Sequence, residues 1–434
     1  MDKSKNKDHR QIGQELELFF TNDIAPGAPF WLPKGMIIFR ELEKYILELT
    51  SKAGYLETST PIMIKSELFK QSGHFDKFGE HNMYNLMLSD QADDSKPILY
   101  TLKPMNCPES TILYRFRPRS YRELPLRFSE IGRLHRREKS GEVNGLLRVR
   151  QLTMDDAHIY AAEDQIFDEI SKILDMMVQF YKKFGFEYEF RFATRPESRA
   201  GTDEMWDRAE KYLEDVIKKK DVKAGDKKGD GAFYGPKIDV HIKDSLGREW
   251  QLATVQIDFH QPEAFKLTYI DQSGKEKRPV MIHRAIFGSF ERFIAILTEH
   301  YQGTFPLWLS PVQVVIIPVA DRHAEYANSI VQTIKLQGIR AELDNRNETV
   351  GSKIRDATLQ KVPYIGIIGD KEVQSFDKLR IDPERSRMGQ SSKLKVQSYE
   401  DSLVSIRTRG GEDLGQLRLS QFLNKLKEEI DKKI

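Results

Sequence analysis

The single cysteine and two of the ten histidines are the residues that could hold a metal ion. Cys107, His158 and His283 lie far apart along the chain, so their spacing is not that of a zinc finger. A single cysteine more often packs in a core, and isolated histidines are commonly core or surface residues. If the fold brought the three together, a thiolate and two imidazoles would form a zinc site with a fourth position open to a substrate. Both interpretations fit the residues.

A second group of residues is rich in arginine and could hold phosphate. Three arginines fall within 133–137, directly before Glu138, and Arg148 and Arg150 follow a glycine-containing loop. A guanidinium group is always charged and can bind phosphate oxygens through two parallel hydrogen bonds. The alternative is a set of salt bridges with the nearby glutamates, Glu130, Glu138 and Glu142. No glycine-rich phosphate loop occurs between a strand and a helix, so side chains would have to hold a nucleotide.

The elements that must position these residues follow two patterns. Up to residue 305 the sequence predicts a mixed, mainly antiparallel sheet backed by helices. Apolar spacing predicts helices near 35–49, 163–184, 204–218 and 287–301, and strands over 55–64, 186–192 and 232–259 with a turn at 245–247. Residues 97–160 are typical of short strands and loops. Alternation over 146–150 would place Arg148 and Arg150 on one side of a sheet.

The pattern changes after a proline-containing junction at 304–311. Predicted strands at 312–319, 339–343 and 364–368 alternate with helices at 324–336 and 350–360, which indicates a parallel sheet with helices on both faces. A polar tract at 376–401 precedes a strand at 404–408 and a last amphipathic helix. We therefore expect two domains, 1–305 and 306–434, in an α/β (α+β) chain.

Composition limits the possible classes of protein. The 434 residues are 39% hydrophobic and 31% charged, which is typical of a soluble globular protein, and no apolar run is long enough to span a membrane. The net charge of +2 provides no general attraction to DNA or RNA, so any nucleic-acid site must be local. One cysteine excludes an intrachain disulfide, and residues 1–10 resemble neither a secretory signal nor a transit peptide.

Three stretches resemble the signature motifs of class II aminoacyl-tRNA synthetases and occur in that family's order. They are a long helix with a strand that ends at Pro61, the segment R-F-S-E (127–130) through R-R-E (136–138) to R-V-R (148–150), and the helix start G-S-F-E-R (288–292). Four shorter strings are similar to threonyl-tRNA synthetases in particular: K-P-M-N-C-P (103–108), D-D-A-H (155–158), F-Y-G-P-K (233–237) and M-I-H-R (281–284). The resemblance runs from about residue 12 to the C-terminus. It implies a class II catalytic domain over 1–305 and an anticodon-binding domain over 306–434.

The resemblance also implies roles for individual residues. It makes Cys107, His158 and His283 the ligands of one Zn²⁺ per subunit, which takes the amino and hydroxyl groups of threonine, and Asp156 the acceptor of that hydroxyl. Valine cannot coordinate zinc and would leave Asp156 unpaired. The positions that match the amino-acid site are Met105, Arg136, Asp156, Tyr234 and Gln256, and those that match the ATP site are Arg136, Glu138, Arg148, Lys237, Gln251, Thr254 and Arg292.

The implied reaction has two steps. The threonine carboxylate attacks the α-phosphorus of ATP, which brings Mg²⁺, and the threonyl group then passes to the 3′ end of tRNA(Thr). His74 matches the histidine proposed to help deprotonate the ribose, so the expected catalytic residues are Arg136, Lys237, His74 and Arg292. In the C-terminal domain, Asn347, Arg355, Glu372 and Arg407 match positions that contact the anticodon.

Some features depart from the common members of the family. Leu152 and Met154 stand where Phe and Gln are usual. No N-terminal editing domain is expected, and measurable charging of serine is therefore expected as well. Editing-free forms occur in mitochondria, and the mitochondrial matrix is therefore the expected location, with the cytoplasm as the alternative. A homodimer is expected, with the helix at 36–49 at the twofold interface, and no membrane or DNA partner.

The residues also allow a comparison with two other classes of protein. A synthetase-like RNA-binding regulator without catalysis would be expected to have lost a zinc ligand or a phosphate-binding arginine, and none is lost. An unrelated zinc hydrolase would need a base beside a metal-bound water, and the sequence contains no H-E-x-x-H helix. The family resemblance therefore predicts a threonine–tRNA ligase.

Overall fold

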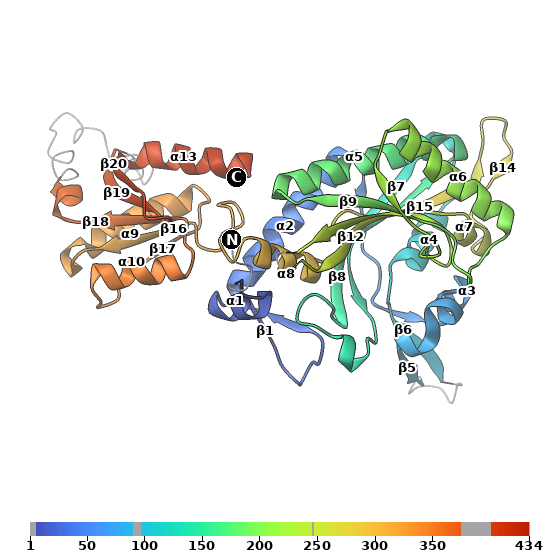
Figure 1. Ribbon diagram of the computed structural model, residues 1–434, viewed down its shortest axis with the longest axis horizontal. Helices are drawn as coiled ribbons and strands as arrows, with labels where there is room; N and C mark the ends of the chain where they lie inside the picture. The colour runs from blue at the N-terminus through green and yellow to red at the C-terminus, as the bar shows by residue number, and fades with distance from the viewer. Residues whose placement is uncertain (1–5, 90–96, 245–246, 375–400, 434) are drawn as a thin grey trace. The chain divides into compact units, whose positions relative to one another are not determined.

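The computed structural model describes residues 6–89, 97–244, 247–374 and 401–433 (Figure 1). The chain divides into two compact units, one formed by Met1–Arg10, Thr21–Phe30 and Glu43–His300 and the other by Gln11–Phe20, Trp31–Leu42 and Tyr301–Ile434. The division predicted from the sequence, 1–305 and 306–434, differs in that it places the segments Gln11–Phe20 and Trp31–Leu42 with the first unit. Among the described residues, no helix combines the length and the apolar character that a bilayer span requires.

An eight-stranded sheet organises the first unit. Its strands follow the order β10 (Ala224–Lys227), β9 (Tyr188–Ala193), β11 (Lys237–Lys243), β12 (Glu249–Asp258), β15 (Val280–Ala285), β8 (Gln151–Ala161), β7 (Leu126–His135) and β3 (Leu56–Glu57). The outer pairs β10–β9 and β3–β7 are parallel and the pairs between them are antiparallel. The predicted mainly antiparallel sheet is confirmed, and β10 is an edge strand that the sequence did not reveal.

Helices cover the apolar face of this sheet. They are α5 (Ile166–Phe184), α6 (Asp203–Lys219) and α8 (Phe290–His300), and Figure 1 shows α5 and α6 lying along the same side. The buried stripe of α5 includes Ile170, Met177 and Phe180, and the Phe180 ring stacks on Phe287 with centroids 5.4 Å apart. Gly185 ends α5 in the left-handed conformation that glycine adopts most easily.

Other elements make up the rest of the chain before residue 301. They include α1 (His9–Glu15), β1 (Phe19–Thr21), β2 (Pro29–Trp31), α2 (Pro33–Lys52), α3 (Glu67–Gln71), α7 (His260–Ala264) and the small hairpin β13 (Tyr269–Ile270) and β14 (Glu276–Lys277). Of these, α1, β1, β2 and α2 are divided between the two units. A second sheet has the order β4 (Met63–Lys65), β6 (Ile98–Leu102) and β5 (Tyr84–Leu88). Of the turn predicted at 245–247, residues 245–246 lie outside the described part of the chain.

Two predictions for the segment 97–160 are wrong. A helix, α4 (Cys107–Arg115), stands where short strands and loops were predicted, with Pro108 in its first turn, where the missing N–H costs no helical hydrogen bond. Residues 146–150 form a turn and not a strand. Gly145 has a φ of 50°, the Asn144 N–H bonds the Arg148 carbonyl, and the consecutive Leu146 and Leu147 are both buried, so sidedness does not alternate.

The second unit contains a five-stranded sheet in the order β17 (Ala341–Leu343), β16 (Val314–Pro318), β18 (Tyr364–Ile368), β19 (Leu403–Thr408) and β20 (Asp413–Arg418). The helices α9 (Ala324–Leu336) and α13 (Leu419–Lys432) share a core on one face, and α10 (Val350–Leu359) packs on the other, as predicted. The parallel arrangement holds for β17, β16 and β18. The predicted strand at 404–408 is β19, which pairs antiparallel to β18. β20, which the sequence did not predict, pairs antiparallel to β19 after a tight turn at Thr408–Gly411. The predicted polar tract, apart from Asp401, lies outside the described residues.

Candidate active site

Polar side chains line up across the eight-stranded sheet. Backbone pairing sets His158 of β8 opposite His283 of β15, His283 opposite Gln256 of β12, and Gln256 opposite Lys237 of β11. Directly opposed residues point to the same face of a sheet, so these four side chains share one face, and Asp156 joins them two residues along β8. The neighbouring residues on the other face are fully buried isoleucines, Ile159, Ile257 and Ile282. The period of two thus separates a polar face from the core.

The fold brings the three predicted metal ligands together. Cys107, the first residue of α4, lies over the strands that carry His158 and His283, and one ligand atom from each of the three lies within 4.8 Å of the others. All three side chains are buried. Asp258 Oδ2 lies 2.9 Å from Nε2 of His283, which leaves Nδ1 of that ring for a metal, and the Tyr234 ring stacks on His283 at 4.6 Å.

The electrostatics of this cluster suit a divalent cation. Burial, with nearby carboxylates, raises the pKa of the Cys107 thiol, and burial lowers the pKa of His158 well below its usual value, so its imidazole is neutral. A neutral imidazole is a competent metal ligand, whereas the thiol ionises here only when a cation joins it. A thiolate and imidazoles are the donors that zinc prefers. The residues present therefore fit Zn²⁺.

Asp156 lies beside the cluster and points toward the same pocket. Its Oδ2 accepts a hydrogen bond from the Asn106 side-chain amide at 3.0 Å, and its Oδ1 lies 3.8 Å from Nε2 of His158. Burial raises the pKa of Asp156 to about 6. Tyr234 donates its hydroxyl proton to Gln256 at 2.6 Å, and Gln256 in turn donates to Thr254 at 3.0 Å. Polar side chains that can bind a substrate through hydrogen bonds therefore lie beside the metal cluster.

His74 lies against the metal cluster. Its Nε2 is 3.5 Å from Cys107 Sγ, its Nδ1 is 2.8 Å from Ser72 Oγ, and its ring packs edge-on against Phe233. Burial lowers the pKa of His74 to about 3, so the imidazole is neutral and is a weak base in these surroundings.

The phosphate candidates gather on loops at the end of this polar face. Arg148 pairs with Glu138 at 2.8 Å and with Glu142 at 2.9 Å, so two of the salt bridges considered from the sequence are formed. A cavity of about 260 Å³ is lined by Phe78, His81, Asn82, Arg136, Arg137, Glu138, Lys139, Glu142 and Arg148. Arg136 donates from Nε to the Pro104 carbonyl at 3.1 Å. Basic side chains outnumber acidic ones around this space, which favours binding of an anion.

Arg292 is held from two sides. Its Nε donates to the Leu147 carbonyl at 2.9 Å and its Nη1 to the Gln251 carbonyl at 3.1 Å. Burial, followed by the charges of Arg136 and Arg148, lowers the pKa of Arg292 to about 10. An anion bound among these three arginines would relieve their mutual repulsion. Lys237 lies along the same sheet face, paired with the buried Asp239 at 2.8 Å.

Two supports of the site escaped sequence reasoning. Asp258 is held by the backbone N–H of Gln261 at 2.8 Å and by its side-chain amide at 2.9 Å, and so orients His283. Lys103 is buried and lies 2.7 Å from Glu130 and 2.8 Å from the Thr60 hydroxyl, so Glu130 pairs with a lysine and not with an arginine. Both sets of contacts depend on the folded chain, and the residue types and spacing along the sequence do not predict them.

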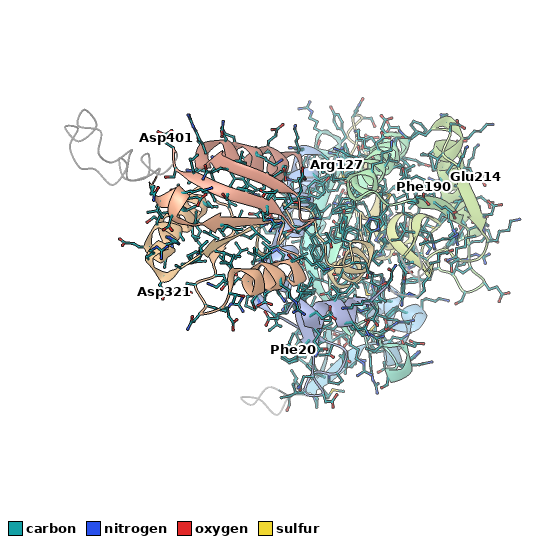
Figure 2. The ribbon with its side chains drawn as sticks, turned by 60° about the vertical axis from the view of Figure 1, so that its left-hand side comes forward. Phe20, Arg127, Phe190, Glu214, Asp321 and Asp401 are labelled. Atoms are coloured by element: carbon teal, nitrogen blue, oxygen red, sulfur yellow. The ribbon has the colours of Figure 1, made fainter. Side chains whose placement is uncertain are left out.

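The second unit contains the predicted anticodon residues at different ends of its sheet. Arg407 pairs with Ile365 near the start of β18, Glu372 lies past the end of that strand, and Arg355 is on α10. Glu372, just past β18, is buried and accepts hydrogen bonds from the Gly369 N–H, the Ser405 hydroxyl and the Gln416 amide. Asp321, after β16, and Asp401, before β19, lie on one side of this unit (Figure 2). They do so because β19 runs antiparallel to β18 and therefore starts where the parallel strands end. Asn347 and Arg355 are exposed. The buried Nε of Arg407 has no hydrogen-bond partner among the described residues.

Comparisons with known families match both units. A model described as the tRNA synthetase class II core domain (G, H, P, S and T) matches residues 90–301, and one described as an anticodon binding domain matches residues 313–429. The sheet and the arginine cluster are those of a class II aminoacyl-tRNA synthetase with an anticodon-binding domain. A crystal structure of the RNA binding domain of threonyl-tRNA synthetase from Cryptosporidium parvum Iowa II superimposes with a TM-score of 0.86 at 34% identity, covering 98% of each chain. This chain belongs to the threonyl-tRNA synthetase family.

Curated relatives agree with this assignment. Threonine–tRNA ligases from Carboxydothermus hydrogenoformans and Acetivibrio thermocellus are 47% and 46% identical over 433 residues. The chain spans 63% of the length of each. A structure of a threonyl-tRNA synthetase from Aeropyrum pernix has the same fold, with a TM-score of 0.76 at 24% identity over 98% of this chain and 96% of that one.

Proposed function

We propose that the chain is a threonine–tRNA ligase that converts threonine and ATP to threonyl-adenylate and transfers threonine to the 3′ end of tRNA(Thr). The observation that carries the proposal is the convergence of the Cys107, His158 and His283 ligand atoms within 4.8 Å, with Asp156 on the same sheet face. Family membership and the match to the anticodon binding domain support the same function.

Selection of threonine would rest on two features of one pocket. Bound by Cys107, His158 and His283, Zn²⁺ would supply a Lewis-acidic position for the amino and hydroxyl groups of the amino acid. Asp156, oriented by Asn106, would accept the hydroxyl proton of threonine. Valine would leave this buried carboxyl without a partner, a loss far larger than that of one methyl group.

Activation would use the cationic groups of the adjoining loops. Arg136 would bridge the substrate carboxylate and the α-phosphate, while Arg148, Lys237 and Arg292 would hold the remaining phosphate oxygens of ATP, which enters with Mg²⁺. Glu138, Gln251 and Thr254 would complete the nucleotide site. These groups would neutralise the charge that builds on the phosphate as the carboxylate attacks and pyrophosphate leaves.

Transfer would follow on the same face of the sheet. His74, whose Nε2 lies 3.5 Å from Cys107 Sγ, would help to deprotonate the ribose hydroxyl of the terminal adenosine, for which its pKa would have to rise when substrate is bound. In the second unit, Asn347, Arg355, Glu372 and Arg407 would read single-stranded anticodon bases on their edges.

We further propose a homodimer. In the helix expected at the twofold interface, Leu42 and Ile46 are buried within the chain, whereas Met36 and Leu49 are half-buried, so that expectation stays a prediction. Leu56, Ile62 and Met63, which follow α2, are exposed and apolar and would supply the twofold contact. A single-chain mass by light scattering at micromolar concentration would contradict this arrangement. The mitochondrial location stays a prediction.

The test is ATP–pyrophosphate exchange with threonine, serine and valine. We expect exchange with threonine, weaker exchange with serine by roughly 10–200-fold, and exchange with valine lower by roughly 10⁴-fold. No exchange with any amino acid would favour the alternative of a catalytically inactive RNA-binding regulator. ATP hydrolysis that does not depend on an amino acid would favour a hydrolase.

A further inference from the structure

A histidine at the N-terminal end of the first unit contacts the phosphate-binding loop from behind. His9 is buried, and its Nε2 accepts a hydrogen bond from the Leu146 backbone N–H at 3.1 Å. On the other side, His9 Nδ1 lies 2.7 Å from Oε1 of the fully buried Glu299 on α8, and the His9 backbone N–H donates to the same oxygen at 3.1 Å. The ring therefore joins a helix to a loop.

The contacts determine the tautomer of this ring. Because a backbone N–H can only donate, Nε2 must be the acceptor, and the ring proton must be on Nδ1, facing the carboxylate. Arg248 holds the other oxygen of Glu299 at 2.7 Å, so the carboxylate is fixed in turn. His9 thus presents Nε2 as a fixed hydrogen-bond acceptor to the loop.

The loop that His9 contacts carries or holds the arginines that are expected to bind phosphate. Leu147, next to Leu146, provides the carbonyl that holds Arg292, and Arg148 follows directly. Leu146 and Leu147 are buried, so the loop has a defined path. A Cβ on Gly145 would lie 2.2 Å from Nε2 of His9, which shows how closely the ring approaches the backbone at this point.

We propose that His9 is a positioning residue for ATP. His9 lies outside the matched core domain of residues 90–301 and is not one of the predicted substrate-binding residues. It nevertheless fixes the backbone of the loop that carries Arg148 and whose Leu147 carbonyl holds Arg292. The proposal rests on the proposed function, because the ligand it concerns is the ATP of that reaction. Without His9, the Leu146 N–H loses its acceptor and the two guanidinium groups lose their common anchor.

The experiment compares the full-length wild-type chain with His9→Ala and His9→Gln. Gln14→Ala, an exposed position on α1, is the control. Calorimetry measures the Kd of Mg-ATP, pyrophosphate exchange gives separate KM values for ATP and threonine, and hydrogen exchange follows the Leu146 amide. For His9→Ala we expect the Kd and KM of ATP to rise by about tenfold, the KM of threonine to stay within about twofold, and Leu146 to exchange at least about tenfold faster. His9→Gln, whose amide oxygen can accept from Leu146, should recover part of the ATP affinity.

Several outcomes would overturn the proposal. Equal increases in both KM values with a lowered melting temperature would show a structural role only, and an unchanged Kd of Mg-ATP despite faster Leu146 exchange would show that the contact does not reach the nucleotide. If the wild-type chain binds Mg-ATP but supports no exchange, the proposed function fails, and the ratio of Kd values still decides the role of His9. A wild-type chain that does not bind Mg-ATP would contradict both.

A double-mutant cycle protects the test against a variant that folds poorly. Gly145→Ala pushes a methyl group against the His9 ring, and His9→Ala removes the atom it meets. We expect the two changes to be non-additive in the Kd of Mg-ATP, with the double variant closer to His9→Ala than the sum predicts. Additive effects would contradict a direct contact.

Discussion

The metal cluster and the phosphate loops lie on one sheet face but are built in different ways. The ligands His158 and His283 come from paired central strands, Cys107 comes from a helix start, and the two groups whose pKa values are shifted, Cys107 and His158, are both neutral in their surroundings. Arg148 and Arg292 are anchored to a turn, and their charges oppose one another. The cluster is a rigid pocket, and the loops form a cationic site that an anion completes.

This difference indicates how binding energy is divided. A rigid buried pocket discriminates between side chains, because a wrong group leaves polar atoms unpaired. A cationic loop contributes affinity for any suitably placed phosphate, and each arginine contributes a part. Substitutions in the cluster should therefore remove the reaction, whereas substitutions in the loops should weaken the use of ATP.

The largest effect is expected from His158→Ala. Loss of one of three ligands should release the metal and lower threonine-dependent pyrophosphate exchange by roughly 10⁴-fold. Metal content and exchange are measured on the same sample, with His300→Ala, at the end of α8, as the control histidine. If His158→Ala kept its full metal content, His158 would not be a metal ligand, and the contrast between the cluster and the loops would fail.

A smaller effect is expected from Arg292→Lys. Lysine keeps the charge but cannot bond the Leu147 and Gln251 carbonyls and a phosphate together, so the KM for ATP should rise by roughly 10–100-fold. The KM for threonine should change little. Initial-rate kinetics measure both, with Arg278→Lys, which lies outside the phosphate loops, as the control. Equal increases in the two constants would show that loop and pocket are not separate.

The two regions also differ in how far the sequence predicted them. The assignment of Cys107, His158 and His283 as metal ligands depends on the family resemblance, since the residue types and spacing alone favour packing in the core. The strands that carry the two histidines have clear alternation, because one face is core. The arginine loop was predicted as a strand and is a turn, because Gly145 at positive φ reverses the chain and two adjacent leucines are buried.

Contacts across long separations were beyond sequence reasoning. Asp258 orients His283, Lys103 pairs with Glu130, and His9 reaches Leu146, and each depends on strand register or on a chain segment folded back onto the sheet. In the second unit the three parallel strands followed from the strand–helix alternation. The antiparallel pair did not, because the turn at Thr408–Gly411 carries no strong apolar signal.

A substitution in the second unit tests whether the comparison extends beyond the first. Arg355→Ala removes an exposed predicted anticodon contact, so the KM for tRNA should rise by about tenfold. ATP–pyrophosphate exchange, which needs no tRNA, should stay unchanged. Aminoacylation kinetics with transcribed tRNA(Thr) provide the measurement, and a fall in exchange would contradict independent roles for the two units.

The smallest effect concerns stability and a carboxyl next to Arg292. Burial raises the pKa of Glu291 from 4.5 to about 7, and Thr153 donates its N–H to the Glu291 carboxyl at 2.9 Å. The unfolded chain binds fewer protons than the folded one between these values, so the free energy of unfolding should fall as pH rises from about 4.5 to 7. Glu291→Gln should flatten that part of the profile, as measured by urea denaturation across pH. An unchanged slope would show that Glu291 is ionised in the folded protein.

The central claim is that Cys107, His158 and His283 hold a zinc ion that selects threonine. Anomalous diffraction at the zinc edge, combined with metal analysis of the same active preparation, tests it most directly. The account predicts one zinc per chain, bonded to Cys107 Sγ and to a ring nitrogen of each histidine, with activity proportional to zinc content. Fully active protein without zinc, or an anomalous peak away from these three side chains, would contradict it.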